Sequence, residues 1–421
     1  MISTRLIDDD NLMVPERFAA GRPLNDWRTL RRECPVYWSQ PRGYRPYWSV
    51  TRHADIIEVE SRPDIFRNSP RFMILDQRFE TYMRDNFGSL DDLMKLMVQM
   101  DAPEHTRHRA LLQPWFTPRA MQARQLRVDQ ICNDFFDRFR RGGRGGRGGL
   151  DGGQEGEIDF AHGIAFWYPL RVACSQLGTP EADDPQIQEM SEELLSFSAP
   201  KPGEKSGLEK MLEYLGALAE DRRKNPQDDL STYLVNALID GQPLLPRELL
   251  AHFVIVATAG HDTTTTTIAG GVQALLEHPD QWQLLRDDPT RLNAAVEEIL
   301  RWVSPNLQFA RTAMEDYVLG GQRIARGESL ALLFSCANRD EKVFGDPDNF
   351  RIDRSPNPHL AFGTGSHSCL GVQLARMELR SFFKTFIDRI EHAELTGQVT
   401  WQPTNLVTRM AQMPIRYRFY H

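Results

Sequence analysis

The stretch AFGTGSHSCLG, from Ala361 to Gly371, places three glycines, a histidine and a cysteine directly before an apolar run with helical spacing. The periodicity predicts a helix that begins near Leu370, so Cys369 lies at the expected helix N-terminus. Free N–H groups and the positive end of the helix dipole favour a thiolate there, which predicts a lowered pKa for Cys369. The glycines let the backbone turn tightly and approach a flat partner without interference from Cβ atoms.

Two interpretations of this cysteine loop (Ala361–Gly371) stay open from its own residues. A thiolate held by backbone N–H donors and facing a planar group is what a porphyrin iron requires of an axial sulfur ligand. The alternative is a small buried cysteine at a helix start, without any chemistry. Other segments of the chain distinguish the two.

The longest expected helix runs from about Pro246 to His278. Thirty residues of helix reach about 45 Å, enough to cross a domain. A central helix is expected to be apolar on all sides. Asp262 and the five threonines that follow it break this pattern, which indicates a chemical role for these polar side chains. Threonine hydroxyls bend helices by bonding back to carbonyls, and a neighbouring carboxylate can pass protons. Ala259 and Gly260 leave room for a small ligand such as O2. The alternative is that the threonines serve only core packing.

Glu298 and Arg301, three residues apart in VEEILRWVSP, lie on one face of a further expected helix. On a surface, such a pair stabilises the protein by roughly a few tenths of a kcal/mol. Because an aromatic residue and a proline follow, the pair is also consistent with a buried bidentate contact that braces the chain beneath the cysteine loop.

Four basic side chains lie at three separate places in the sequence. His105 and Arg109 are four residues apart and share a helix face, whereas Arg311 and His367 come from later segments. Each alone is typical of a solvated charge. Together they would clamp two carboxylates, such as porphyrin propionates.

Composition excludes several classes of protein. The 421 residues carry a formal net charge of −8, which argues against a general nucleic-acid binder. The five cysteines are dispersed and form no CxxC pair, so a zinc knuckle, an all-cysteine iron–sulfur site and a disulfide framework are all disfavoured. Neither a secretory signal nor a long apolar run is visible, which predicts a soluble, cytoplasmic protein without a membrane anchor.

The pattern along the chain predicts one mainly α domain over residues 1–421, with a minor β portion. The Gly/Arg-rich tract at residues 140–157 is expected to be a flexible loop within it. An RNA contact is the alternative, but the tract has no interleaved aromatic residues.

The chain resembles the soluble bacterial type of the cytochrome P450 family, over roughly residues 40–420. Three family motifs occur in the expected order. The first is Ala-Gly-x-Asp-Thr, at Ala259, Gly260, Asp262 and Thr263. The second is Glu-x-x-Arg, at Glu298 and Arg301. The third is Phe-x-x-Gly-x-x-x-Cys-x-Gly, at Phe362, Gly365, Cys369 and Gly371.

The resemblance implies the cytochrome P450 fold, a triangular, mainly α domain with a long central helix over haem b. It implies that Cys369 is the axial iron ligand, and that Asp262 and Thr263 deliver protons while O2 is activated. Phe362, Gly371, Ala259 and Gly260 then lie at the cofactor, and the propionates contact His105, Arg109, Arg311 and His367. The implied reaction is hydroxylation of a C–H bond.

Electrons would come from NAD(P)H through a separate ferredoxin and reductase, because no such domain is fused to the chain. Arg107, Arg376 and Arg380 are expected to dock an acidic ferredoxin onto a monomeric enzyme. A non-catalytic haem sensor and a peroxygenase using H2O2 are alternatives, and the acid–alcohol pair argues against both. The expected substrate is a small hydrophobic terpenoid, steroid or fatty chain. Its pocket is predicted at Phe72, Leu75, Val256, Leu307 and Phe309.

Overall fold

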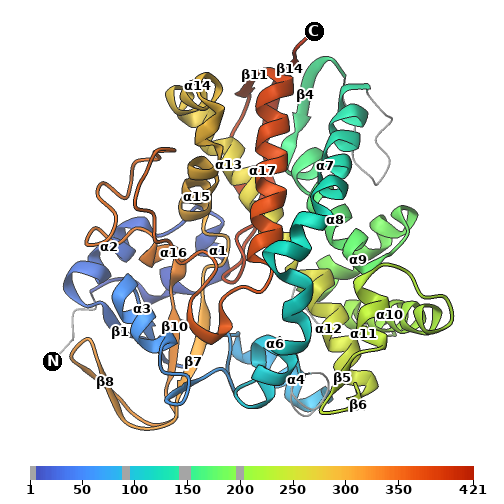
Figure 1. Ribbon diagram of the computed structural model, residues 1–421. Coiled ribbons are helices and arrows are strands. Elements are labelled where there is room, and N and C mark those ends of the chain that lie inside the picture. The colour runs from blue at the N-terminus through green and yellow to red at the C-terminus, as the bar shows by residue number, and fades with distance from the viewer. Residues whose placement is uncertain (1–5, 88–94, 142–152, 196–202) are drawn as a thin grey trace.

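Figure 1 shows the computed structural model, which describes residues 6–87, 95–141, 153–195 and 203–421. Helices dominate the described chain, and the larger sheet lies to one side of them, so the predicted mainly α class with a minor β portion is confirmed. The helices are α1 (Pro15–Phe18), α2 (Leu24–Glu33), α3 (His53–Glu60), α4 (Gln77–Phe87), α6 (Glu104–Leu112), α7 (Pro118–Arg141), α8 (Trp167–Leu177), α9 (Asp184–Leu195), α10 (Gly207–Lys224), α11 (Leu230–Val235), α12 (Pro246–Ala259), α13 (Asp262–Glu277), α14 (Pro279–Asp287), α15 (Leu292–Val303), α16 (Phe334–Ala337) and α17 (Val372–Arg389).

The strands are short and fall into several sheets. A five-stranded sheet has the order β1-β2-β10-β7-β3, and a three-stranded sheet has the order β11-β14-β4. In the larger sheet β10 runs parallel to β2 and antiparallel to β7. The strands are β1 (Val36–Ser39), β2 (Tyr47–Val50), β3 (Phe66–Arg67), β4 (Glu155–Asp159), β5 (Leu238–Ile239), β6 (Gln242–Pro243), β7 (Phe309–Ala313), β8 (Tyr317–Leu319), β9 (Gln322–Ile324), β10 (Ser329–Leu332), β11 (Ile390–Leu395), β12 (Thr400–Trp401), β13 (Met410–Gln412) and β14 (Pro414–Phe419).

The main apolar core surrounds α17, which packs against α7, α13 and α15 (Figure 1). The apolar run predicted to form a helix after the cysteine loop does so, and its residues Phe382, Phe383 and Phe386 are all buried. Gly271 of α13 permits the closest approach, since a Cβ there would come within 2.5 Å of the Phe383 ring. Helix α13 therefore lies directly against α17.

The predicted long helix over residues 246–278 is interrupted in the structure. Helix α12 ends at Ala259, Gly260 and His261 separate the two parts, and α13 begins at Asp262. Threonine back-bonding occurs on both sides of the break: Thr258 Oγ1 donates to the carbonyl four residues earlier at 2.8 Å, and Thr267 Oγ1 does so at 2.7 Å. The expected single helix is therefore two helices, and the break lies beside the polar cluster at which the threonines were expected to bend it.

The Gly/Arg-rich tract was predicted with bounds that are too wide. Arg140 and Arg141 belong to the last turn of α7, and Glu155 begins strand β4. Residues 142–152 lie outside the described residues. Among the helices that the structure describes, none combines the length and the apolarity needed to cross a membrane.

Candidate active site

A cavity of about 490 Å³ lies where α12, α13, β7 and the cysteine loop meet. Its lining is largely apolar, and its volume falls in the usual range of about 300–1,000 Å³ for ligand and cofactor sites. Cys369, Asp262, Thr263, His105 and Arg311 all line it, although they are distant in sequence. The fold therefore brings the candidate residues from four segments to one place.

The cysteine loop presents its sulfur to this cavity. Cys369 is exposed there, and its backbone N–H donates to the Phe362 carbonyl at 2.8 Å. Gly365 has a φ of +66°, and a Cβ on it would lie 2.5 Å from the Glu60 carbonyl oxygen, so this turn requires glycine. Gly371 caps α17, which begins at Val372 rather than at the predicted Leu370.

The predicted lowering of the Cys369 pKa was wrong for the protein chain alone. Burial raises the pKa of this thiol, and the opposing effects of the Gly371 N–H, Arg109 and Arg376 are smaller. The sequence shows the helix end that favours a thiolate, but it does not show how much protein surrounds the sulfur. A cationic partner in the cavity would supply the missing stabilisation of the thiolate.

The rings of His105 and His367 stack at the cavity edge, with centroids 3.9 Å apart. Burial, followed by the electrostatic effects of the neighbouring His105, Arg311 and Arg109, lowers the pKa of His367 to about 2. Burial and the charge of Arg109 also lower the pKa of His105. Both imidazoles are therefore neutral at neutral pH, and His105 Nε2 is buried with no hydrogen-bond partner in the described residues.

The two arginines of this group have different partners. Arg311 Nη2 lies 2.6 Å from a carboxylate oxygen of Glu60, whereas among the described residues Arg109 reaches only the Ser368 hydroxyl at 3.4 Å. The structure thus brings together all four predicted basic residues, and it adds Glu60, which the sequence did not single out. The apolar cavity is thus surrounded by two guanidinium groups, an unpartnered buried imidazole nitrogen and an exposed sulfur. This set of groups fits a flat, dianionic metal complex such as haem b.

Asp262 and Thr263 begin α13 at the opposite side of the helix break from Ala259. The Thr263 hydroxyl donates to the Ala259 carbonyl at 3.4 Å, and both Asp262 and Thr263 line the cavity. The Asp262 carboxylate is paired with Arg409, a residue that the sequence analysis did not find. No periodicity or motif signals this partner, because 147 residues separate the two in sequence.

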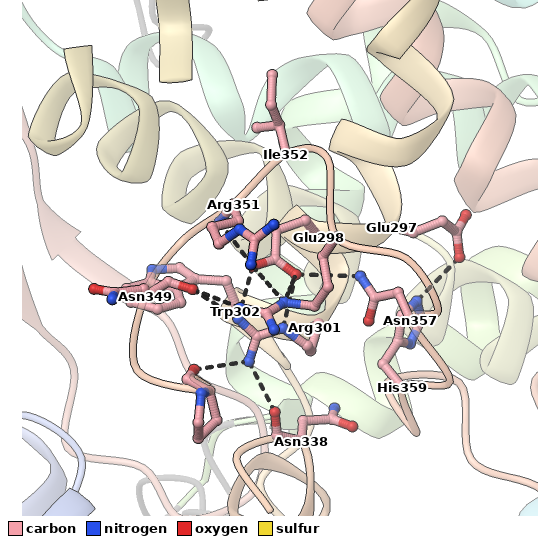
Figure 2. Close-up of polar contacts among 12 residues, drawn as sticks. Glu297, Glu298, Arg301, Trp302, Asn338, Asn349, Arg351, Ile352, Asn357 and His359 are labelled. Atoms are coloured by element: carbon pink, nitrogen blue, oxygen red, sulfur yellow. Dashed lines mark hydrogen bonds and ion pairs between the residues drawn. The ribbon is translucent and has the colours of Figure 1, made fainter. Parts of the chain in front are cut away.

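Glu298 and Arg301 form a fully buried bidentate pair, with both N–O distances at 2.7 Å (Figure 2). The alternative of a surface pair is therefore excluded. Arg301 also donates to the Asn338 carbonyl at 2.9 Å, and the Asn338 side chain accepts from the Leu360 N–H at 2.7 Å. Because Leu360 directly precedes the cysteine loop, the pair braces the chain that leads into it.

Three of the five residues that were predicted for a substrate pocket lie at this cavity. Phe72, Val256 and Phe309 line the cavity, as do Ala259, Gly260, Phe362 and Gly371. Leu75 and Leu307 do not, and these two predictions were wrong. Leu307 is buried in a separate apolar cluster, and Leu75 lies two residues before the start of α4. The sequence analysis missed other lining residues, among them Phe79 and Tyr82 of α4 and Leu96, Met97, Leu406 and Val407.

Comparisons of the sequence and of the fold with known proteins all point to one family. A sequence model of the family described as Cytochrome P450 matches residues 185–419. Cytochrome P450-terp from a Pseudomonas species is 33% identical, over 96% of this chain and 96% of that protein. A steroid C26-monooxygenase from Mycolicibacterium smegmatis is 34% identical, over 89% of this chain and 86% of that protein. The crystal structure of CYP108D1 from Novosphingobium aromaticivorans has a TM-score of 0.88 at 31% identity, covering 99% of each chain.

The mainly helical fold and the cavity with its exposed cysteine sulfur define an oxygen-activating haem enzyme. The chain belongs to the cytochrome P450 family. It is a monooxygenase with haem b as its cofactor and O2 as a co-substrate, as the sequence resemblance implied.

Proposed function

We propose that this enzyme hydroxylates a C–H bond of a small hydrophobic terpenoid, steroid or fatty-chain molecule. The observation that carries the proposal is that the Cys369 sulfur and the Asp262–Thr263 pair line the same, largely apolar cavity. A relative named as a steroid C26-monooxygenase, 34% identical, supports this substrate class. Electrons come from NAD(P)H through a separate ferredoxin and reductase.

The chain's own residues have distinct roles in this reaction. Cys369 Sγ would ligate the haem iron, and His105, Arg109, Arg311 and His367 would hold the two propionates. The haem, when bound, supplies the iron at which O2 is activated, and thiolate ligation favours O–O cleavage. The apolar wall orients the substrate and excludes water. The proton route is through the Asp262 carboxylate and the Thr263 hydroxyl.

Substrate class is tested with a panel of terpenoids, steroids and fatty acids. Haem-loaded enzyme is titrated with each, binding is followed by the Soret shift, and products are measured with a surrogate ferredoxin and reductase. Products from hydrophobic ligands support the proposal. Tight ligand binding without any product would favour a haem sensor, and product with H2O2 but not with reductase would favour a peroxygenase.

Thr263→Ala is expected to keep haem and substrate binding while product formed per NADH falls about tenfold, since a positioned proton-transfer group contributes at least that much. Oxygen consumed without product should appear as peroxide. Thr265→Ala is the matched control, because Thr265 Oγ1 has no partner in the described chain and does not line the cavity. Equal coupling in both variants would remove Thr263 from the proton route.

The ferredoxin surface is proposed around Arg376 and Arg380, four residues apart on α17. Arg376 pairs with Glu297 at 2.7 Å, and Arg107 pairs with Asp240 at 2.9 Å, so these two arginines are already compensated in part. Arg380 is the stronger candidate for the intermolecular contact.

Arg380→Gln is expected to raise the KM for ferredoxin about fivefold at low ionic strength, because a charge at an interface rim mainly governs association. The difference should shrink at high salt as the charges are screened. Arg323→Gln, an exposed arginine on β9, is the matched control. Turnover that does not slow with rising ionic strength would contradict the docking proposal.

A further inference from the structure

The acid of the proposed proton route is held from outside its own helix. Asp262 Oδ2 pairs with Nη2 of Arg409, which directly precedes strand β13. Both groups are largely withdrawn from solvent, with 9% of the Asp262 side chain and 18% of the Arg409 side chain exposed. A buried carboxylate depends strongly on such a partner, because removing one member leaves an uncompensated charge.

The segment that carries Arg409 is also part of the cavity wall. Leu406 and Val407 line the cavity just before it. Thr408 is fixed on several sides: its N–H donates to the Pro305 carbonyl at 2.8 Å, its hydroxyl accepts from Arg22 at 3.1 Å, and its carbonyl accepts from Thr266 of α13. Residues 406–409 therefore place the guanidinium against α13 with little freedom.

His261 is the other basic group beside the acid, and it does not compensate the charge. Its Nδ1 lies 2.9 Å from the Ala257 carbonyl, which can only accept, so Nδ1 carries the proton. Its Nε2 lies 3.8 Å from Asp262 Oδ1, beyond hydrogen-bond distance. Burial lowers the pKa of His261, so the ring is neutral at neutral pH. The cationic partner in this geometry is Arg409.

We propose that Arg409 is a positioning residue for proton delivery: its ion pair holds Asp262 Oδ2 on the side of residues 406–409, which leaves Oδ1 for transfer. The inference rests on the proposed role of Asp262 in the proton route. A proton from solvent binds Oδ1, passes to the Thr263 hydroxyl, and the hydroxyl's own proton moves on into the cavity. Only O–H bonds form and break in this step, so no further oxidant or reductant is involved.

The test is a double-mutant cycle on the haem-loaded enzyme with Arg409→Gln, Arg409→Lys and Asp262→Asn. Arg409→Gln should leave the substrate-induced Soret shift unchanged, lower product per NADH about tenfold and increase the solvent deuterium isotope effect on turnover. Arg409→Lys retains the charge and should recover at least half of the coupling. In the Asp262→Asn background, neither Arg409 substitution should lower coupling further. Arg416→Gln, an exposed arginine of β14, is the matched control.

Thermal unfolding of the cofactor-free protein gives an independent readout. Arg409→Gln should lower the melting temperature more in the wild-type background than in the Asp262→Asn background, because only the former leaves a buried carboxylate unpaired. If the Arg409→Gln protein cannot be purified, Arg409→Lys is measured in the same two backgrounds. The same cycle then applies, with a smaller expected decrease in the melting temperature.

The outcomes separate the two proposals. If Asp262→Asn leaves coupling unchanged, the proton route itself is wrong. If Asp262→Asn uncouples turnover, the proton route stands. The role of Arg409 is then overturned if Arg409→Gln has the same coupling as the control variant, or if it lowers coupling equally in both backgrounds.

Discussion

Cys369→Ser is expected to abolish both the thiolate-ligated haem spectrum and coupled turnover. A serine hydroxyl has the size of the thiol, but it ionises far less readily. The surrounding protein already opposes ionisation of the thiol itself, because burial raises the pKa of Cys369. The measurement is the absorption spectrum of the reduced, CO-treated protein after haem supplementation. The variant should fold, since the side chain faces a cavity rather than the core.

Cys34→Ser is the matched control for this substitution. Cys34 is partly exposed, lies outside the cavity lining, and should keep the full spectrum and turnover. A thiolate-type spectrum retained by Cys369→Ser would show that another group ligates the iron, and the proposed site would then be wrong. A serine variant that binds haem with an altered spectrum would agree with the proposal, because the basic side chains at the cavity edge remain.

Local sequence patterns were sufficient to predict individual helices that form the site, and α17 is an example. Its apolar residues recur at helical spacing, and all of those predicted are buried in the structure. The motif residues Phe362, Cys369, Asp262 and Thr263 also reach one cavity. Periodicity predicts the helix because it depends on residues within a few turns of each other, whereas the meeting of the motif residues was implied by the family resemblance.

Contacts between distant segments could not be derived in this way. Arg409 beside Asp262, and Glu60 beside Arg311, join positions separated by well over a hundred residues, and neither partner is marked by a motif. The predicted direction of the Cys369 pKa shift was wrong for the same reason, because desolvation depends on all the protein that surrounds the sulfur.

Glu298→Gln is expected to destabilise the protein by about 3–5 kcal/mol, the usual cost of removing one partner from a buried ion pair. The carboxylate accepts two hydrogen bonds from Arg301 and further bonds from Arg354, the Arg351 N–H and Asn357 (Figure 2). A neutral amide leaves two buried guanidinium groups without their counter-charge. The free energy of unfolding, measured by denaturant titration of the cofactor-free protein, checks the prediction.

The neighbouring Glu297 provides the control, because it is the same residue type on the same helix with a different environment. It is partly exposed and pairs with Arg376 and His359, so Glu297→Gln should cost only about 1 kcal/mol or less. Arg301→Lys separates charge from geometry. A lysine retains the charge, but it cannot donate to both Glu298 oxygens and to the carbonyls of Asn338 and Pro347 together. It should therefore destabilise the protein nearly as much as Glu298→Gln does, and wild-type stability in that variant would mean that charge alone holds the buried network.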